Sequence, residues 1–142
     1  MLILKLLSAL VLAAFAASAE LADTDVPELV IDQTYVPTDC TVKTKEGDKI
    51  RVHYTGKLTN GNKFDSSHDR NSPLPLTLGA RQVIPGWEEG LLDMCLNEKR
   101  VLTIPSRKAY GSRGFGNVIP PKSALVFEVE LVGLESAARD EL

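Results

Sequence analysis

The chain has 142 residues, of which 44% are hydrophobic and 25% are charged, and its formal net charge at pH 7 is −3. This length and apolar content suit one globular domain with a sizeable core. The sequence has no basic block that could bind phosphates, so we predict no nucleic-acid partner.

Residues 1–19 have the features of a secretory signal peptide. Lys5 is the positive charge, an apolar run extends to Phe15, and Ala17-Ser18-Ala19 forms a small-residue cleavage site. The apolar run is shorter than the roughly 20 residues of a transmembrane helix, although an uncleaved anchor is the alternative. Cleavage would leave a chain with a net charge of about −4 and no membrane span.

Residues 20–39 are interpreted as a lead-in and an edge strand. The stretch 21–27 is short and acidic, and we expect it to be flexible. β-branched residues in the segments 28–35 and 41–43 predict two short edge strands, separated by a turn at residues 37–39.

A hairpin is predicted around Asn60-Gly61. Before it, Ile50, Val52 and Tyr54 alternate with polar residues, which is the pattern of a half-buried strand. Asn-Gly favours a type I′ turn, because both central residues of that turn need positive φ. The chain then returns in a strand through Phe64.

The next segments are predicted to be a loop and a strand. Residues 65–71 are polar and favour a loop or a bulge. Leu74, Leu76 and Leu78 alternate with other residues in a strand that ends at Gly79.

Residues 83–92 contain the only tryptophan of the chain. Pro85 suits the first turn of a helix, because its missing N–H would be unpaired there anyway. Trp87, Leu91 and Met94 recur at spacings of three and four and so share one helical face. We therefore predict a short helix that lies across a sheet, with Trp87 at the join.

Two strands and a long loop follow. Residues 99–104 form the first strand and residues 125–134 the second, in which Phe127, Val129 and Leu131 face one way. The loop at 106–123 is rich in Gly and Pro but also carries apolar residues, which argues against disorder. Long loops in compact domains are usually functional, so we expect a role for this one.

Cys40 and Cys95 are the only cysteines. The sequence lacks a C-x-x-C pattern, which would have indicated zinc or redox chemistry. In an oxidising compartment a disulfide is the plainest interpretation. Such a bond would close a loop of about 55 residues and stabilise the fold by roughly 4 kcal/mol in the chain-entropy model. Two buried free thiols are the alternative.

Residues 136–142 form a polar tail that ends in Arg-Asp-Glu-Leu. This ending differs by one residue from the KDEL and HDEL retrieval signals. Together with a signal peptide it predicts residence in the lumen of the endoplasmic reticulum. An ordinary secreted protein with an acidic tail is the alternative.

The sequence offers no convincing hydrolytic site. His53 lies at a solvent-facing strand position and His68 in a polar loop, so we expect neither to act as a base or a metal ligand. Glu88 and Glu89 are explained by a helix N-terminus, which favours negative charge, rather than by acid–base catalysis. We predict no metal and no cofactor.

Several short motifs nevertheless occur in the order and spacing of a known family. They are Val52-His53-Tyr54-Thr55-Gly56, Phe64-Asp65-Ser66-Ser67, Val83-Ile84-Pro85-Gly86-Trp87, Ala109-Tyr110-Gly111 and the stretch from Ile119-Pro120-Pro121 to Phe127. Across residues 43–135 the chain closely resembles the macrolide-binding FKBP-type peptidyl-prolyl isomerases. The signal peptide, the cysteine pair and the tail resemble the small ER-lumenal branch of that family.

The resemblance implies an α+β fold, with an antiparallel, curved sheet of about five or six strands wrapped around one short helix. The isomerase domain would span residues 40–135. The catalytic residues that the resemblance implies are Tyr54, Phe64, Asp65, Trp87, Tyr110 and Phe127. The residues that it implies for binding of substrate or macrolide are Arg70, Leu74, Gln82, Val83, Ile84, Val118 and Ile119.

In such a pocket Trp87 would form the floor, and the Ile84 N–H and the Tyr110 hydroxyl would donate hydrogen bonds to ligand carbonyls. The implied partners are X-Pro-containing unfolded or nascent secretory polypeptides and macrolide immunosuppressants, bound by a monomer. A proline-recognising binding module or chaperone with little turnover is the alternative. Leu74 stands where the family usually has an aromatic residue, so macrolide affinity is expected to be weaker.

Overall fold

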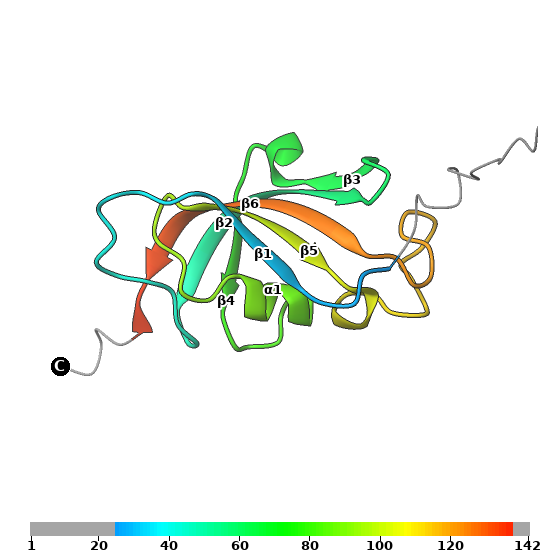
Figure 1. The fold of residues 1–142 in the computed structure, drawn as a ribbon. Coiled ribbons are helices and arrows are strands. Elements are labelled where there is room, and N and C mark those ends of the chain that lie inside the picture. The colour runs from blue at the N-terminus through cyan, green and yellow to red at the C-terminus, as the bar shows by residue number, and fades with distance from the viewer. Residues whose placement is uncertain (1–24, 138–142) are drawn as a thin grey trace, which may run out of the picture.

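The computed structural model describes residues 25–137. The predicted signal peptide and the Arg-Asp-Glu-Leu ending lie outside these residues. Figure 1 shows an antiparallel sheet with a short α-helix against it. Within residues 25–137 the sheet has six strands and there is a single α-helix. The predicted α+β architecture is therefore confirmed.

The strand β2 pairs with three other strands, more than any other strand of the sheet. The strands are β1 (Val30–Tyr35), β2 (Lys49–Leu58), β3 (Lys63–Ser66), β4 (Leu74–Thr77), β5 (Lys99–Ile104) and β6 (Leu125–Glu135). Their order is β1-β5-β6-β2-β3, and β4 also pairs with β2. One edge of β2 pairs with β6 along its whole length, whereas the other edge is shared by β4 and β3. The pocket described below lies where this shared edge divides.

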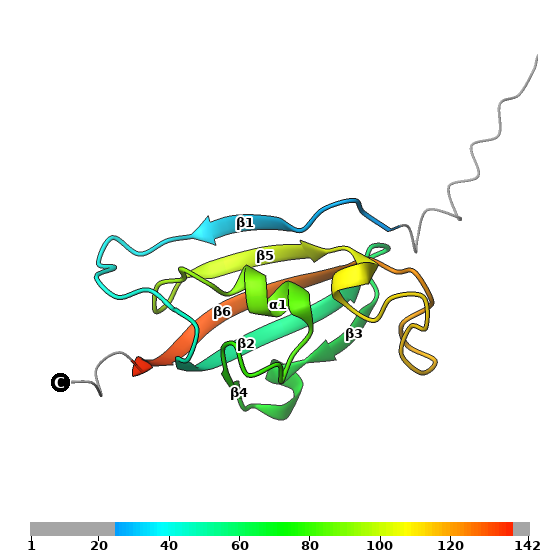
Figure 2. The ribbon, with the colours of Figure 1, turned by 90° about the horizontal axis from the view of Figure 1, so that it is seen from below.

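The helix α1 (Pro85–Gly90) lies across one face of the sheet, and Figure 2 shows it over β5, β6 and β2. Pro85 begins it, as predicted. Gly86 and Gly90 let it approach β5 closely, because an added Cβ would lie 2.4 Å from Ile104 Cγ2 and 2.7 Å from Leu102 Cδ1.

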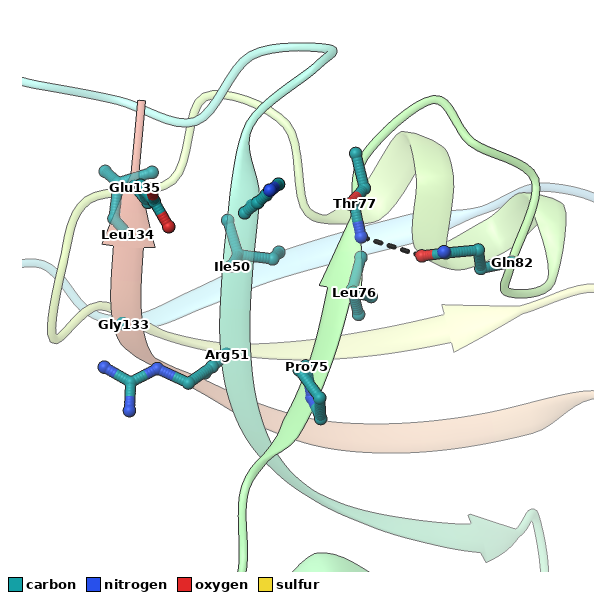
Figure 3. A pocket seen from close by; sticks show the side chains of 10 residues that line it. Ile50, Arg51, Pro75, Leu76, Thr77, Gln82, Gly133, Leu134 and Glu135 are labelled. Atoms are coloured by element: carbon teal, nitrogen blue, oxygen red, sulfur yellow. Dashed lines mark hydrogen bonds between the residues drawn. The ribbon is translucent and has the colours of Figure 1, made fainter. Parts of the chain in front are cut away.

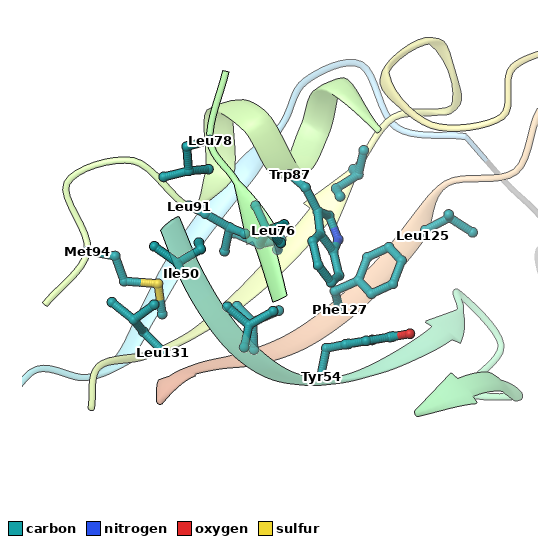
Figure 4. Packing of buried hydrophobic residues seen from close by; sticks show 14 of the residues in the cluster. Ile50, Tyr54, Leu76, Leu78, Trp87, Leu91, Met94, Leu125, Phe127 and Leu131 are labelled. Atoms are coloured by element: carbon teal, nitrogen blue, oxygen red, sulfur yellow. The ribbon is translucent and has the colours of Figure 1, made fainter. Parts of the chain in front are cut away.

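The core fills the space between α1 and the sheet. Trp87, Leu91 and Met94 are exposed by only 3%, 0% and 0% of their surfaces. Figure 4 shows Trp87 and Leu91 between the helix and the strands, with Phe127 beside the Trp87 ring and Met94 beyond the helix end near Leu131. The three residues are buried as predicted, but they do not share a helical face, because α1 ends at Gly90, Leu91 is its C-cap and Met94 follows in the turn.

The second predicted edge strand, at residues 41–43, is absent. Within the described residues Lys43 makes only an isolated bridge to Cys95. The segment is held instead against the turn after α1, where the Thr44 N–H donates to the Met94 carbonyl and the Asp93 N–H donates to the Thr44 carbonyl, each at 3.0 Å. The predicted disulfide between Cys40 and Cys95 is present, with the two Cα atoms 5.6 Å apart.

The hairpin at Asn60-Gly61 is present, but the prediction of a type I′ turn is wrong. Gly61 has φ of 91°, whereas Asn60 is not among the described residues with positive φ. The Gly61 N–H donates to the Leu58 carbonyl at 2.9 Å, and the Leu58 N–H donates to the Asn62 carbonyl at 2.9 Å. This is the longer loop that joins a type I turn to a bulge, and it needs positive φ only at its last residue.

Two segments predicted to be irregular contain short 3₁₀ helices. In residues 65–71, β3 continues to Ser66 and is followed by η2 (Ser67–Arg70). The Ser66 side chain accepts a hydrogen bond from the His68 N–H at 3.2 Å, which caps this turn. The long loop begins with η3 (Ser106–Lys108). No helix within the described residues is long and apolar enough to cross a membrane.

Candidate active site

A pocket with a volume of about 370 Å³ opens between β2, β3, α1 and the long loop at residues 106–123, which we call the pocket loop. It gathers most of the residues that the family motifs indicated. Its lining consists of Tyr54, Phe64, Asp65, Leu74, Arg81, Gln82, Val83, Ile84, Trp87, Tyr110 and Phe127.

The floor is a cluster of rings that fix one another. The Trp87 ring meets Tyr54 edge-on at 5.0 Å and Phe127 at 5.2 Å between centroids. Phe64 meets Phe127 at 5.7 Å and an interplanar angle of 86°. Edge-to-face pairs of this kind are favourable because the positive ring edge faces a negative ring face. The Trp87 Nε1 is buried and has no hydrogen-bond partner within residues 25–137.

Gly56 makes this packing possible. A Cβ at this position would lie 2.7 Å from Phe127 Cε1 and 2.7 Å from Phe64 Cζ. Real Cβ atoms essentially never come so close, so any side chain here would displace the two rings. The glycine of the Val52–Gly56 motif therefore has a packing role at the pocket wall.

A polar cluster stands at the rim beside Tyr54. The Tyr54 hydroxyl donates to Asp65 Oδ2 at 2.6 Å, and Arg70 donates to Asp65 Oδ1 and to the Tyr54 hydroxyl, each at 2.7 Å. Burial alone would raise the pKa of Asp65, but the hydrogen bonds from Tyr54 and Arg70 and the Arg70 charge outweigh it and hold that pKa below 3.8. Burial and the hydrogen bond to Asp65 raise the pKa of Tyr54 above 10.0.

A buried serine joins η2 to the strand that carries Tyr54. Ser67 Oγ accepts a hydrogen bond from the Tyr54 N–H at 2.8 Å and lies 2.8 Å from His53 Nδ1. The His53 and His68 rings stack with centroids 4.4 Å apart, and neither ring lines the pocket. No group of three or more His, Cys, Asp or Glu side chains within residues 25–137 could hold a metal ion.

The loop side of the pocket is formed by Tyr110. Burial, followed by the charge of Asp65, raises its pKa above 10.0, so its hydroxyl is a proton donor at neutral pH. That hydroxyl makes no hydrogen bond within residues 25–137, and the Ile84 N–H has no acceptor there. Both groups are therefore available to a bound carbonyl.

Three of the predicted binding residues do not line the pocket. Arg70 stands behind its wall, in contact with Asp65 and Tyr54. Ile119 is 3% exposed and belongs to the core, where it anchors the pocket loop through a bridge to Phe115. Val118 is 48% exposed on that loop.

Sequence reasoning missed Arg81 as a lining residue. It has φ of 58°, an unusual conformation for an arginine, and its N–H donates to Glu88 Oε1 at 3.2 Å. Glu88 Oε2 also accepts from the Gly79 N–H at 2.6 Å. Glu88 thus holds the turn before α1 in addition to its place near the helix N-terminus, and no pattern in the sequence signals this contact.

A second cavity, of about 550 Å³, lies where β4, β2 and the end of β6 meet (Figure 3). Its lining includes Arg51, Pro75, Leu76 and Gly133, and no aromatic side chain. The two cavities share Gln82, whose side chain accepts a hydrogen bond from the Thr77 N–H at 2.8 Å. The aromatic pocket is therefore the candidate site for an apolar ligand.

Comparison with known proteins agrees with this geometry. The family model for FKBP-type peptidyl-prolyl cis-trans isomerase matches residues 40–132. FK506-binding protein 2 of Dictyostelium discoideum is 53% identical over 107 residues, which are 75% of this chain and 80% of that protein. FK506-binding protein 2 of Yarrowia lipolytica is 47% identical over 135 residues, 94% of this chain and 92% of that protein. A crystal structure of AtFKBP13 has a TM-score of 0.69 and 35% identity, and covers 80% of this chain and 98% of its own.

Proposed function

Because this chain belongs to the FKBP-type peptidyl-prolyl cis-trans isomerase family, we propose that it uses the aromatic pocket to isomerise X-Pro bonds of secretory proteins in the lumen of the endoplasmic reticulum. We also propose that macrolides bind in the same pocket. The observation that carries the proposal is a cavity whose floor is the Trp87 ring and whose rim offers the Tyr110 hydroxyl, which has no hydrogen-bond partner in the described part of the chain.

The proposed mechanism uses desolvation. Rotation about an X-Pro bond has a barrier of about 18–20 kcal/mol that arises from amide resonance. The planar amide is more polar than the twisted one, and water stabilises the planar form. A pocket of apolar rings removes this water and so favours the transition state over the ground state. No covalent step and no cofactor are required.

Binding geometry supplies the second contribution. The Ile84 N–H and the Tyr110 hydroxyl lie at the pocket and are donors that a substrate carbonyl could use. Holding a carbonyl on each side of the rotating bond would fix the proline ring over Trp87 and lower the entropic cost of reaching the twisted state. Asp65 would keep the Tyr54 ring in place and set the electrostatic field at the rim.

Three features support the lumenal location. The first 19 residues read as a signal peptide and the last four as a retrieval-like signal. The Cys40–Cys95 disulfide fits an oxidising compartment. The macrolide proposal is supported by the curated relatives, which are named FK506-binding proteins. Leu74 lines the pocket where the family usually has a ring, so we expect weaker macrolide affinity.

A protease-coupled assay on a short X-Pro peptide, with and without rapamycin, tests the activity. We expect catalysed isomerisation that rapamycin inhibits. Rapamycin binding without turnover would instead establish the alternative, a proline-recognising binding module. Turnover that is insensitive to rapamycin would overturn the macrolide proposal alone.

The location is tested separately in cells. The full chain and a variant that lacks its last four residues are expressed, and the protein in the medium is compared with the protein in the cell. We expect the full chain to stay in the endoplasmic reticulum and the shortened chain to be secreted. Equal secretion of both would contradict the lumenal proposal.

A further inference from the structure

The segment that precedes β1 lies against the start of the pocket loop, as both ribbon views show (Figures 1 and 2). Asp25 accepts two hydrogen bonds from Ser106, a residue 81 positions away. One comes from the Ser106 N–H at 2.8 Å and the other from its hydroxyl. Arg107 donates to the Pro27 carbonyl at 2.7 Å, so the two segments are joined at neighbouring points.

Ser106 in turn holds the backbone on both sides of Tyr110. Its carbonyl accepts hydrogen bonds from the Ala109 N–H at 2.9 Å and from the Gly111 N–H at 2.8 Å. Ser106 is only 6% exposed. A shift of Ser106 would therefore be transmitted to the residues on either side of Tyr110.

Asp25 is suited to this task by its charge as well as its position. Burial would raise its pKa, but the hydrogen bonds from Ser106 and Val26 and the Arg107 charge outweigh burial and hold the pKa below 3.8. The carboxylate is thus ionised at neutral pH. Hydrogen bonds to an ionised acceptor are shorter and stronger than those between neutral groups.

We propose that Asp25 is a positioning residue of the isomerase, which fixes Ser106 and through it the placement of Tyr110 at the pocket. The inference rests on the proposed role of Tyr110 in substrate binding. It gives the segment between the predicted signal peptide and the first strand a function in catalysis. The effect is partial, because Lys108 also ties η3 to α1 through Glu89 at 2.7 Å.

A double-mutant cycle on kcat/KM tests the proposal. Asp25→Ala is expected to lower kcat/KM for a short X-Pro peptide about fivefold, since misplacement of a binding group weakens catalysis. In a Tyr110→Phe background the same change should lower kcat/KM by less than about twofold, because coupled residues are not additive. Asp25→Asn retains an acceptor for the Ser106 N–H and should recover most of the loss.

Two further measurements separate positioning from general stability. The amide resonances of Ser106 and Gly111 should shift in Asp25→Ala, while its thermal midpoint stays within a few degrees of the parent. Glu28→Gln is the matched control: it removes the exposed ion pair with Arg107 from the same segment and should leave kcat/KM unchanged.

Equal losses from Asp25→Ala in both backgrounds, or no loss in either, would overturn the proposal. The Tyr110→Phe single variant reports on the underlying role of Tyr110. If that variant loses activity and Asp25→Ala does not couple to it, only the positioning inference fails. If it keeps full activity, the role of Tyr110 fails and the inference fails with it.

Discussion

The two polar sides of the pocket are held in different ways. On the β2–β3 side, Tyr54, Asp65 and Arg70 form a closed set of hydrogen bonds with distances of 2.6 to 2.7 Å. On the loop side, the Tyr110 hydroxyl has no partner within residues 25–137, and its ring packs against Phe115 with centroids 5.2 Å apart. The polar groups of the β2–β3 side are hydrogen-bonded to one another, whereas the loop side has a hydroxyl donor that the described residues leave unused.

This difference indicates different contributions to catalysis. A hydroxyl that already has two charged partners gains little from a substrate, because a new hydrogen bond would replace an existing one. In the proposed mechanism the β2–β3 side therefore supplies shape and a fixed electrostatic field. In the same mechanism the loop side would supply a binding contact, and the backbone on either side of Tyr110 is held by hydrogen bonds to the Ser106 carbonyl.

The largest effect is expected at the floor, where the two sides meet. Trp87→Ala removes a ring that is 3% exposed and touches Tyr54 and Phe127. We expect the free energy of unfolding to fall by about 3–5 kcal/mol, as for other buried aromatic truncations. We expect kcat/KM on an X-Pro peptide to fall about a hundredfold, since both sides lose their common support.

Urea denaturation and the coupled assay measure these two effects, and Met94→Leu is the matched control. Met94 is buried near α1 but does not line the pocket, so this volume-conserving change should cost less than about 1.5 kcal/mol and leave kcat/KM unchanged. A folded Trp87→Ala variant with parental kcat/KM would remove the indole from the mechanism.

The next effect breaks the β2–β3 side alone. Asp65→Ala takes away the acceptor of Tyr54 and Arg70 and leaves the Tyr54 ring without its tether. We expect kcat/KM to fall at least about tenfold with little change in stability, because the carboxylate is partly exposed and misplacement acts mainly on catalysis.

The control for this variant is Asp69→Ala. Asp69 forms an exposed ion pair with Lys63 at 3.0 Å, and its side chain does not line the pocket. Its removal should leave kcat/KM unchanged. If both aspartate variants lost activity equally, a general charge effect would replace the specific role of Asp65.

The sequence predicts well those parts of the molecule whose pattern repeats over short distances. Alternation at Ile50, Val52 and Tyr54 locates β2, because one face of the strand is buried. Pro85 and the spacing of Trp87 and Leu91 locate α1. The family motifs then indicate the ring cluster of the pocket, which local patterns alone could not distinguish from ordinary core.

The errors occur where distant contacts decide the structure. We expect a flexible segment at 21–27, of which the structure describes only residues 25–27, and there Asp25 binds Ser106 across 81 positions. The 41–43 segment has strand composition but is held to Cys95 and to the turn after α1 instead of pairing along a strand. Arg81 enters the pocket lining because its backbone adopts positive φ, held by Glu88. The residues next to these positions in the sequence do not predict which residues they contact in the fold.

A smaller effect is expected from pH. The pKa of Asp65 is lowered from 3.8, so its contribution to stability and geometry is present above that value and is lost only as pH falls through the lowered pKa. The pKa values of Tyr54 and Tyr110 are raised from 10.0, so both hydroxyls stay protonated below that value. We therefore expect kcat/KM to vary less than about twofold between about pH 6 and pH 9. A drop centred near neutral pH would show that a different group controls the pocket.

The smallest effect is expected at the tip of the pocket loop and sharpens what the loop side does. Val118 is 48% exposed and does not line the pocket. Val118→Ser should change stability by less than about 0.5 kcal/mol and kcat/KM on a short peptide by less than about twofold. A macrolide is larger than a prolyl residue and would extend onto the loop, so its affinity should fall about threefold through lost apolar contact. Titration with rapamycin measures the affinity, and the peptide assay measures kcat/KM. Equal losses of affinity and kcat/KM would mean that the loop tip acts on the pocket itself rather than on ligands that reach beyond it.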